Sequence, residues 1–149
     1  MTAAVDPRGA LGGRLGHTFQ DADLLREALT HRSFANENAG ARDNERLALL
    51  GDAMLSLVVA ERLLAAAPAD PVGVLTPRRA ALVSGENLGR WAAAVDLGTH
   101  LRLGRGEEQM GGRAKESVLA TALEAVLGVI YLEGGLDAGR RAIGLLAVW

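Results

Sequence analysis

Two apolar segments with helical spacing constrain the fold of this chain more than any other feature, and each contains one charged residue. Residues 47–60 read LALLGDAMLSLVVA, with Asp52 as the charged residue, and residues 117–132 read SVLATALEAVLGVIYL, with Glu124. A buried carboxylate without a partner costs several kcal/mol, so such an acid usually has an ion-pair partner, a helix end or a metal ion to bind. If the two helices pack together, Asp52 and Glu124 meet in one pocket, and pockets rich in oxygen atoms suit Mg²⁺.

The composition favours helices and a single domain. Only 3% of the 149 residues are aromatic, and Ala, Leu and Val supply most of the apolar side chains. This mixture is typical of helices rather than sheets, and a chain of this length holds one domain with a hydrophobic core. The sequence has neither strand-like alternation nor internal repeats. We therefore expect an all-α fold.

Capping residues, prolines and glycines indicate where the helices begin and end. Residues 33–43 and 96–114 are polar or rich in glycine, which predicts loops. The expected helices are 21–31 capped by Asp21, 45–66 capped by Asp43 or Asn44, 76–94 with Thr76 as N-cap and Pro77 in the first position, 117–132 stopped by Gly134–Gly135, and 136 to the chain end.

The sequence also indicates a compartment. It contains no cysteine, which excludes disulfides and thiolate metal sites. Asp6, Arg8 and Arg14 interrupt the stretch in which a signal peptide needs apolar residues, and no later run reaches roughly 18 uncharged apolar residues. We expect a cytoplasmic protein without a membrane segment.

The charge balance argues mildly against a nucleic-acid partner, because the net charge is −2 and the isoelectric point is near 5.9. Local clusters of positive charge favour such a partner, because arginine and lysine outnumber acids in residues 76–90 and 102–115. These cations are Arg78, Arg79 and Arg90 in the first stretch, and Arg102, Arg105, Arg113 and Lys115 in the second.

The two lone acids have a second interpretation. Glu45 lies seven residues before Asp52, on the same helical face, and is a candidate supporting acid for a metal site. Alternatively, each lone acid pairs with an arginine of another helix, with Arg46, Arg62, Arg78 and Arg79 as candidates.

Three further features have ordinary structural explanations. His31 either touches phosphate or completes hydrogen bonds at a helix end. Glu107 and Glu108 are expected in a solvated loop. The glycine-rich stretch 104–113 neither follows a strand nor matches a P-loop, so it does not predict a phosphate cradle.

Five blocks of the sequence resemble the ribonuclease III family. Residues 44–55, NERLALLGDAML, are similar to the family signature NERLEFLGDAVL. The other blocks follow in the family's order, and the resemblance spans roughly residues 11–147. They are ALTHRSFANEN at 28–38, GVLTPRRAALVSGENL at 73–88, LRLGRGEEQMGGRAKESVLA at 101–120 and ALEAVLGVIYLEGGLDA at 122–138.

The resemblance implies an endoribonuclease of the ribonuclease III endonuclease-domain fold, spanning residues 1–149. It implies a Mg²⁺-dependent enzyme, with Mn²⁺ as a possible substitute, that cuts double-stranded RNA in RNA processing such as rRNA or mRNA maturation. It also implies a symmetric homodimer that holds the RNA duplex, in which duplex RNA is bound through phosphates and 2′-hydroxyls. The candidate RNA contacts are Asn44, Arg78, Arg105, Arg113 and Lys115.

The sequence departs from the family pattern at its metal site. The family uses four acids, of which Asp52 and Glu124 are present as catalytic and metal-binding residues. Ala48 and Thr121 occupy the positions of the other two, so metal affinity and rate are expected to suffer. Leu49 replaces the aromatic residue that plugs the dimer interface in the family. We expect no C-terminal double-stranded-RNA-binding domain within residues 1–149.

These departures leave two rival functions open. The loss of two acids favours a non-cleaving member that binds duplex RNA or associates with ribosomes. A helical protein-interaction dimer without RNA is the third possibility, and a gel shift with duplex RNA distinguishes it from the other two.

Overall fold

The computed structural model describes residues 5–147 and 149, and these residues form helices joined by short connections. No strand occurs in this part of the chain, where the one β-type pairing is an isolated bridge between Thr30 and Arg102. The expectation of an all-α fold is therefore confirmed. The helices are α1 (Pro7–Leu15), α2 (Ala22–Ala28), α3 (Arg32–Glu37), α4 (Glu45–Ala66), α5 (Val72–Leu82), α6 (Gly85–Ala94), η1 (Leu97–His100), α7 (Arg105–Gln109), η2 (Gly112–Ala114) and α8 (Glu116–Leu146).

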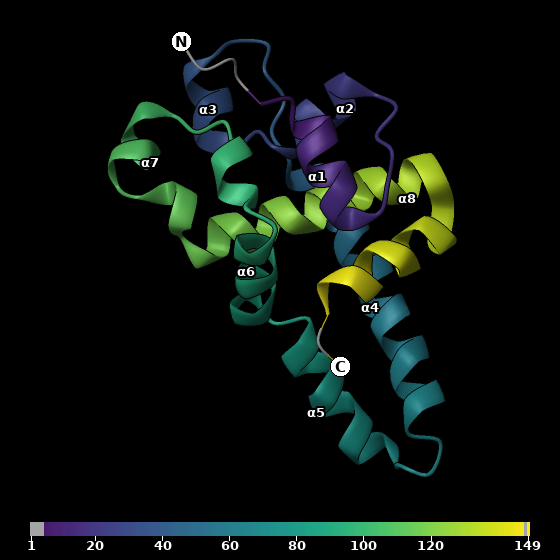
Figure 1. Cartoon of the computed structure of the whole chain (residues 1–149). Helices are drawn as coiled ribbons and strands as arrows, with labels where there is room; N and C mark the ends of the chain where they lie inside the picture. Colours follow the sequence, from purple (N-terminus) through teal and green to yellow (C-terminus); the bar gives the residue numbers. More distant parts are fainter. Residues whose placement is uncertain (1–4, 148) are drawn as a thin grey trace.

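Helix α8 forms the centre of the core, and the other long helices pack around it (Figure 1). Its most extensive contact is with α4, followed by α6, while α1 and α2 cover another side. The lower half of α4 and the following α5 extend as an arm away from this core (Figure 1). No residue of α5 is fully buried, and Leu75 and Leu82 attach it to its neighbours.

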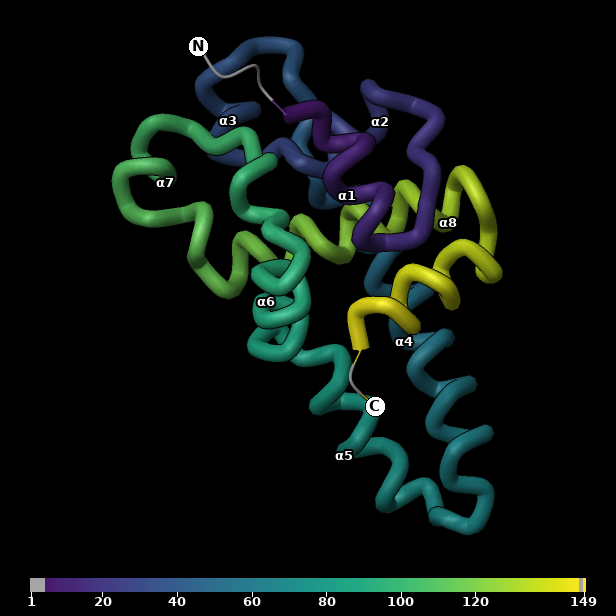
Figure 2. Tube along the Cα trace, viewed as in Figure 1, coloured from purple at the N-terminus to yellow at the C-terminus, as the bar shows by residue number. Residues whose placement is uncertain are grey.

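Helix α8 has the length and composition of a membrane-crossing helix, but its apolar residues from Val118 to Ile130 are mostly buried within the fold. This burial is typical of a central core helix. The helix is broken at Gly135, whose φ of 69° lies in the left-handed region that glycine adopts without strain. The C-terminal part then folds back along the first part (Figure 2). The predicted stop at Gly134–Gly135 is therefore confirmed.

Several helix boundaries agree with the predicted caps. Helix α4 spans the predicted residues, and the Asp43 carboxylate accepts a hydrogen bond from the Glu45 N–H at 3.1 Å. The Asp21 carboxylate accepts hydrogen bonds from the N–H groups of Asp23 and Leu24, both at 3.0 Å. Short polar side chains therefore define these two starts through hydrogen bonds that depend on adjacent residues alone.

The predicted helix over 76–94 is wrong at its start and in its middle. Helix α5 begins four residues earlier, at Val72, where the carbonyl of Pro71 accepts hydrogen bonds from Val74 and Leu75. Pro77 lies in the middle of the helix, where its missing N–H removes one hydrogen bond. The chain then leaves the helix at Val83, and Ser84 caps a separate α6.

Three short helices were not predicted, because their stability depends on partners far along the chain. Helix α1 has Asp6 as N-cap and Pro7 in its first turn, and it buries Leu11 and Leu15. Helix α3 occupies the first part of the predicted loop 33–43, and Arg102 lies over its Phe34 ring at 4.2 Å. Helix α7 interrupts the predicted loop 96–114.

The packing of α4 on α8 depends on two glycines that bring the helix backbones together. A Cβ atom at Gly51 would collide with the carbonyl oxygen of Glu124, and one at Gly128 would collide with the carbonyl oxygen of Leu47. Side chains larger than hydrogen at these positions would force the helices apart. The sequence GD at 51–52 therefore combines a contact residue with an adjacent carboxylate.

We predict that Gly51→Ala lowers the free energy of unfolding by about 2 to 3 kcal/mol, because the added methyl group cannot be accommodated between two backbones. Gly73→Ala is the matched control, since a Cβ at Gly73 has no atom within 4 Å. The control should raise the stability by up to about 1 kcal/mol through helix propensity. Urea unfolding measures both, and equal stabilities for the two variants would contradict the close approach.

Candidate active site

The crossing of α4 and α8 brings the two lone acids together. Asp52 follows Gly51 on α4, and Glu124 is the residue whose backbone Gly51 contacts on α8. Asp52 is exposed and Glu124 is half-buried, so the pair lies at the surface end of the helix contact. The condition under which the two acids meet, that their helices pack together, is therefore met.

Burial and the neighbouring charge of Asp52 raise the pKa of Glu124 from 4.5 to about 7. The burial is the larger cause, because it removes water from the ionised carboxylate. A carboxyl group in this state accepts a cation readily, since a cation favours the charged form and reduces the repulsion between the two acids.

The alternative in which each acid pairs with an arginine is wrong. Within residues 5–147 and 149, neither Asp52 nor Glu124 has a cationic side chain within 4.0 Å. Arg78, one of the suggested partners, binds Asp70 at 3.2 Å, and Arg62 lies over the Trp149 ring at 4.4 Å. No cationic side chain of the described residues therefore neutralises the pair.

Glu45, which its helical face places on the side of Asp52, pairs with an arginine in the structure. Its carboxylate lies 3.8 Å from the guanidinium of Arg32, and both side chains are exposed. Two turns of helix separate it from Asp52 along α4, a rise of about 10 Å. No group of three or more acids, histidines or cysteines suited to a metal occurs among the described residues. Among the described residues, the candidate site therefore brings together two carboxylates and not three.

The positions of the two missing acids have unlike surroundings. The Ala48 side chain is 5% exposed and belongs to the hydrophobic core. Thr121 is half-buried, and its hydroxyl donates a hydrogen bond to the Ser117 carbonyl at 3.0 Å. A hollow of about 220 Å³ opens beside Thr121 and is also lined by His31, Arg32, Asn44, Glu45, Ser117 and Val118. Space for a longer side chain therefore exists at position 121. Position 48 is packed within the core, so a longer polar side chain there would have to turn away from the core to reach solvent.

Three of the four cationic candidates for RNA contact already have protein partners. Arg113 donates hydrogen bonds to the carbonyls of Gly98 at 3.0 Å and Leu101 at 2.6 Å, so it holds the η1 segment. Lys115 lies 3.6 Å from Glu107, and Arg78 binds Asp70. These contacts reduce the positive charge available to a phosphate.

The structure contradicts the prediction that Asn44 contacts RNA at the surface. Its side chain is 2% exposed, and its amide donates a hydrogen bond to the Ala28 carbonyl at 3.1 Å. Asn44 therefore joins α2 to the start of α4 instead of facing solvent. Arg105 is exposed, and its side chain has no polar partner within the described part of the chain.

His31 and Glu107 act locally. The His31 ring caps α3 by accepting a hydrogen bond from the Ser33 N–H at 3.2 Å, as the structural interpretation predicts. Burial lowers its pKa, which favours the neutral ring. Glu107 is not in a solvated loop, because its side chain is 17% exposed beside Lys115. Sequence spacing alone does not indicate this burial.

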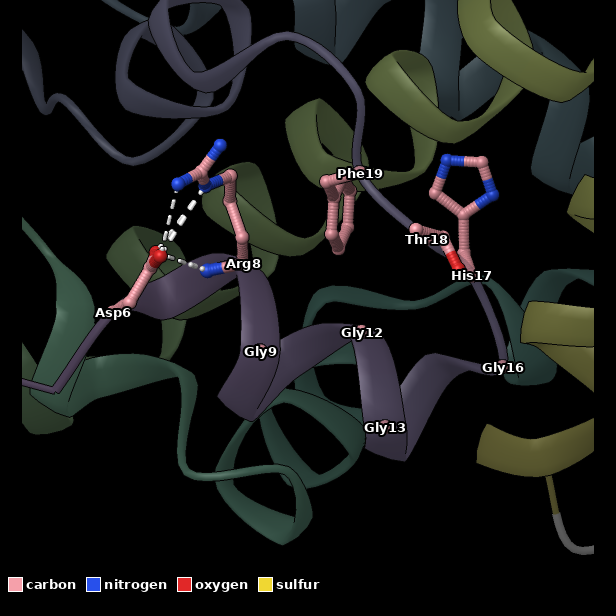
Figure 3. Close-up of a pocket in the computed structure, with 9 residues that line it drawn as sticks. All are labelled: Asp6, Arg8, Gly9, Gly12, Gly13, Gly16, His17, Thr18 and Phe19. Atoms are coloured by element: carbon pink, nitrogen blue, oxygen red, sulfur yellow. Dashed lines mark hydrogen bonds and ion pairs between the residues drawn. The ribbon is translucent and has the colours of Figure 1, made fainter.

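A hollow of about 550 Å³ beside α1 is separate from the carboxylate pair (Figure 3). Gly9, Gly12 and Gly13 line it, and its single carboxylate, Asp6, is paired with Arg8 at 3.1 Å. His17 at its edge lies 2.8 Å from Glu133, whose carboxylate also accepts the Gln20 N–H. These contacts attach the α1–α2 connection to α8, which is a structural function.

Comparisons with known proteins agree with the geometry. A family model described as Ribonuclease-III-like matches residues 21–147. Ribonuclease 3 of Azotobacter vinelandii is 52% identical over 90% of this chain and 57% of its own length, and that of Streptomyces coelicolor is 50% identical over 89% and 48%. The chain thus spans about half the length of the curated relatives it matches.

The solved nuclease domain of ribonuclease III from Campylobacter jejuni has the same fold. One structure superimposes with a TM-score of 0.85 at 40% identity, covering 92% of this chain and 94% of that one. Its description names structural flexibility in a region of that protein involved in dimer formation.

We predict that Glu124 makes the metal-free protein less stable as the pH rises. The folded state binds the Glu124 proton more tightly than the unfolded state, because the pKa is about 7 when folded against 4.5 otherwise. Stability therefore falls as the pH rises from 4.5 to 7 and is constant above. Glu124→Gln should remove this loss and exceed the parent by about 1 to 2 kcal/mol at high pH, since the half-buried group remains partly solvated.

Urea unfolding in chelator at several pH values measures the effect. Glu86→Gln, which removes an exposed carboxyl on α6, is the control for a general change in charge. A difference between parent and Glu124→Gln that stays constant with pH would contradict the raised pKa.

Proposed function

Because the chain belongs to the ribonuclease-III-like family, we propose that it is the catalytic domain of a metal-dependent endoribonuclease that hydrolyses double-stranded RNA. The observation that carries this proposal is the pair of Asp52 and Glu124, held together on crossing helices with no cationic side chain of the described chain within 4.0 Å. RNA processing, including rRNA maturation, is the proposed context.

The two carboxylates fit a magnesium ion. Mg²⁺ usually keeps several waters and takes one or two protein carboxylates, so a pair of acids suffices as a protein contribution. When bound, the ion supplies an activated water and neutralises charge on the phosphate. Glu124, half-buried beside the α4 backbone, fixes one ligand position, and Asp52 presents the other at the surface. Mn²⁺ fits the same oxygen donors.

Exposed cations near the fold's surface support binding of an RNA backbone. Duplex RNA is recognised mainly through its phosphates and 2′-hydroxyl groups, which requires cations rather than side chains that read bases. Arg105 is the candidate with an unoccupied side chain, and Arg78 can exchange its exposed Asp70 partner for a phosphate.

A second copy of the chain is the proposed partner. Leu49, Leu57 and Leu64 lie within one face of α4 and are 76%, 47% and 63% exposed. Apolar side chains along one exposed helix face are typical of an interface. Leu49 keeps an apolar contact there but buries less area than an aromatic ring, so we expect a weaker dimer.

The non-cleaving alternative rests on the incomplete acid set. With Ala48 and Thr121 in place of acids, the described residues contain no metal-suited group of three. A member that binds duplex RNA without cutting it would need the cations and the dimer but not a working metal centre.

We predict that Asp52→Ala and Glu124→Ala each abolish cleavage of a long RNA duplex in Mg²⁺ or Mn²⁺. Each variant removes one of two protein ligands, whereas duplex binding is unchanged or stronger because negative charge near phosphate is lost. Gel-based cleavage and a gel shift in chelator measure the two properties, and sedimentation verifies that the dimer persists.

Asp137→Ala is the control, because this acid is also on α8 and its side chain is 83% exposed. Cleavage at the parent rate by either site variant would contradict the proposed centre. Duplex binding without cleavage by the parent in either metal would favour the non-cleaving alternative.

We further predict that Ala48→Glu combined with Thr121→Asp increases cleavage by about 10- to 100-fold, because supporting ligands strengthen metal binding. Thr121→Asp alone should recover part of this gain, since the hollow beside Thr121 has space for a carboxylate. Ala48→Glu places a charge at a core position, so the double variant should be less stable in chelator and regain stability in Mg²⁺.

Initial cleavage rates across Mg²⁺ concentrations, with melting temperatures in parallel, compare the parent with each variant. A double variant that folds, dimerises and binds duplex yet cleaves no faster would contradict the view that these two positions limit activity.

A further inference from the structure

Two arginines lie close together outside the carboxylate pair, and one of them, Arg102, has no carboxylate partner among the described residues. Arg26 on α2 and Arg102 after η1 line a hollow of about 340 Å³, which we call the Arg26–Arg102 hollow. Arg8 and His100 also line it, and its one acid, Asp6, is paired with Arg8 at 3.1 Å. The remaining charge in the hollow is positive.

The guanidinium of Arg102 is held in a defined position. One face lies over the Phe34 ring at 4.2 Å, and one N–H donates to the hydroxyl of Thr30 at 3.2 Å. Thr30 is fully buried, and its hydroxyl donates in turn to the Arg26 carbonyl at 2.6 Å. Arginine has five N–H donors, so most of those on Arg102 stay available to another ligand.

No carboxylate neutralises Arg102 among the described residues, and residues 1–4 and 148 carry no acidic side chain. Burial and the nearby charge of Arg26 lower the pKa of Arg102. Arg26 itself has a weak partner, since Asp23 is 3.5 Å away and 91% exposed. Two cations are therefore close together at a site where one is partly desolvated.

A purely structural explanation accounts for only part of this arrangement. Arg102 lies beyond the C-terminal end of α2, where a cation is favoured by the helix dipole. That interaction requires one cation, and the second one, Arg26, adds repulsion to it. An anion placed between the two guanidinium groups would reverse the repulsion and satisfy their free N–H donors.

We propose that the Arg26–Arg102 hollow binds a phosphate group at a site separate from the carboxylate pair. Phosphate fits because its oxygens accept paired hydrogen bonds from guanidinium groups. Arg26 and Arg102 also line a neighbouring hollow together with Arg42, but Asp23 and Glu27 on its wall offset two of its three cations, so an anion is less favoured there. The phosphate belongs either to a small phosphorylated molecule or to an RNA backbone, and the experiment separates these two sources.

Arg26→Gln tests the site with little risk to folding, because the Arg26 side chain is 61% exposed. Arg90→Gln is closely matched, since Arg90 is 67% exposed and pairs with Glu86 at 3.4 Å one turn away. Arg102→Lys keeps the charge but loses the planar fork of donors. Binding of inorganic pyrophosphate is measured by calorimetry, and binding of a short RNA duplex by fluorescence anisotropy across salt concentrations.

All measurements use the full chain in chelator, which excludes metal-dependent binding at Asp52 and Glu124 and prevents cleavage. We expect Arg26→Gln and Arg102→Lys to weaken pyrophosphate binding by about tenfold or more, with Arg90→Gln close to the parent. If the source is RNA, pyrophosphate binds weakly in all variants, while Arg26→Gln lowers duplex affinity and makes its salt dependence shallower by about one unit of slope.

Two results would overturn the proposal. One is unchanged binding of both probes in Arg26→Gln and Arg102→Lys, each verified as folded by its melting temperature. The other is an equal loss in Arg90→Gln, which would indicate a general charge effect. Because the pyrophosphate arm requires neither metal nor cleavage, the site can fail while the proposed nuclease function holds, and the reverse is also possible.

Discussion

The close contact between the backbones of α4 and α8 is the constraint on which the rest of the structure depends. Gly51 and Gly128 let each helix approach a carbonyl of the other, and α6, α1 and α2 then pack around the joined pair. A protein interior is nearly as dense as a crystal, so a contact of this kind has little freedom to adjust. The same contact sets the positions of Asp52 and Glu124, which means that the fold and the candidate site share one determinant.

Electrostatics explains why this site is suited to a cation. Elsewhere on the surface, acids such as Glu61 and Asp70 have arginine partners, at 3.0 Å and 3.2 Å. Glu124 instead is half-buried beside a second acid, and its burial, more than the charge of Asp52, raises its pKa. In proteins, strongly shifted pKa values are concentrated at functional sites, where a bound ligand can offset the cost of burying a charged group. With Ala at 48 and Thr at 121, the two acids are the carboxylates that this candidate site offers to a cation.

The arginines fall into two groups: those whose side chains bind other parts of the fold, and those whose N–H donors remain free to bind a ligand. Arg113 and Arg140 donate to carbonyls or carboxylates and thereby connect segments of the fold. Arg105 has an unoccupied side chain, and Arg102 is fixed by Phe34 and Thr30 with most donors free. A net charge of −2 therefore hides local regions where phosphate is favoured. Partner and burial, rather than residue type, distinguish these regions.

The sequence by itself determined the all-α class, the bounds of α4 and the break at Gly134–Gly135, because caps, glycines and apolar spacing act between neighbouring residues. The tertiary structure decided the short helices α1, α3 and α7, the helical position of Pro77 and the burial of Asn44 and Glu107. It also decided that Asp52 lies beside Glu124, that no arginine of the described residues reaches either acid, and that Arg102 lies beside Arg26. These features depend on contacts between segments distant in sequence, and such contacts leave no local pattern from which they can be predicted.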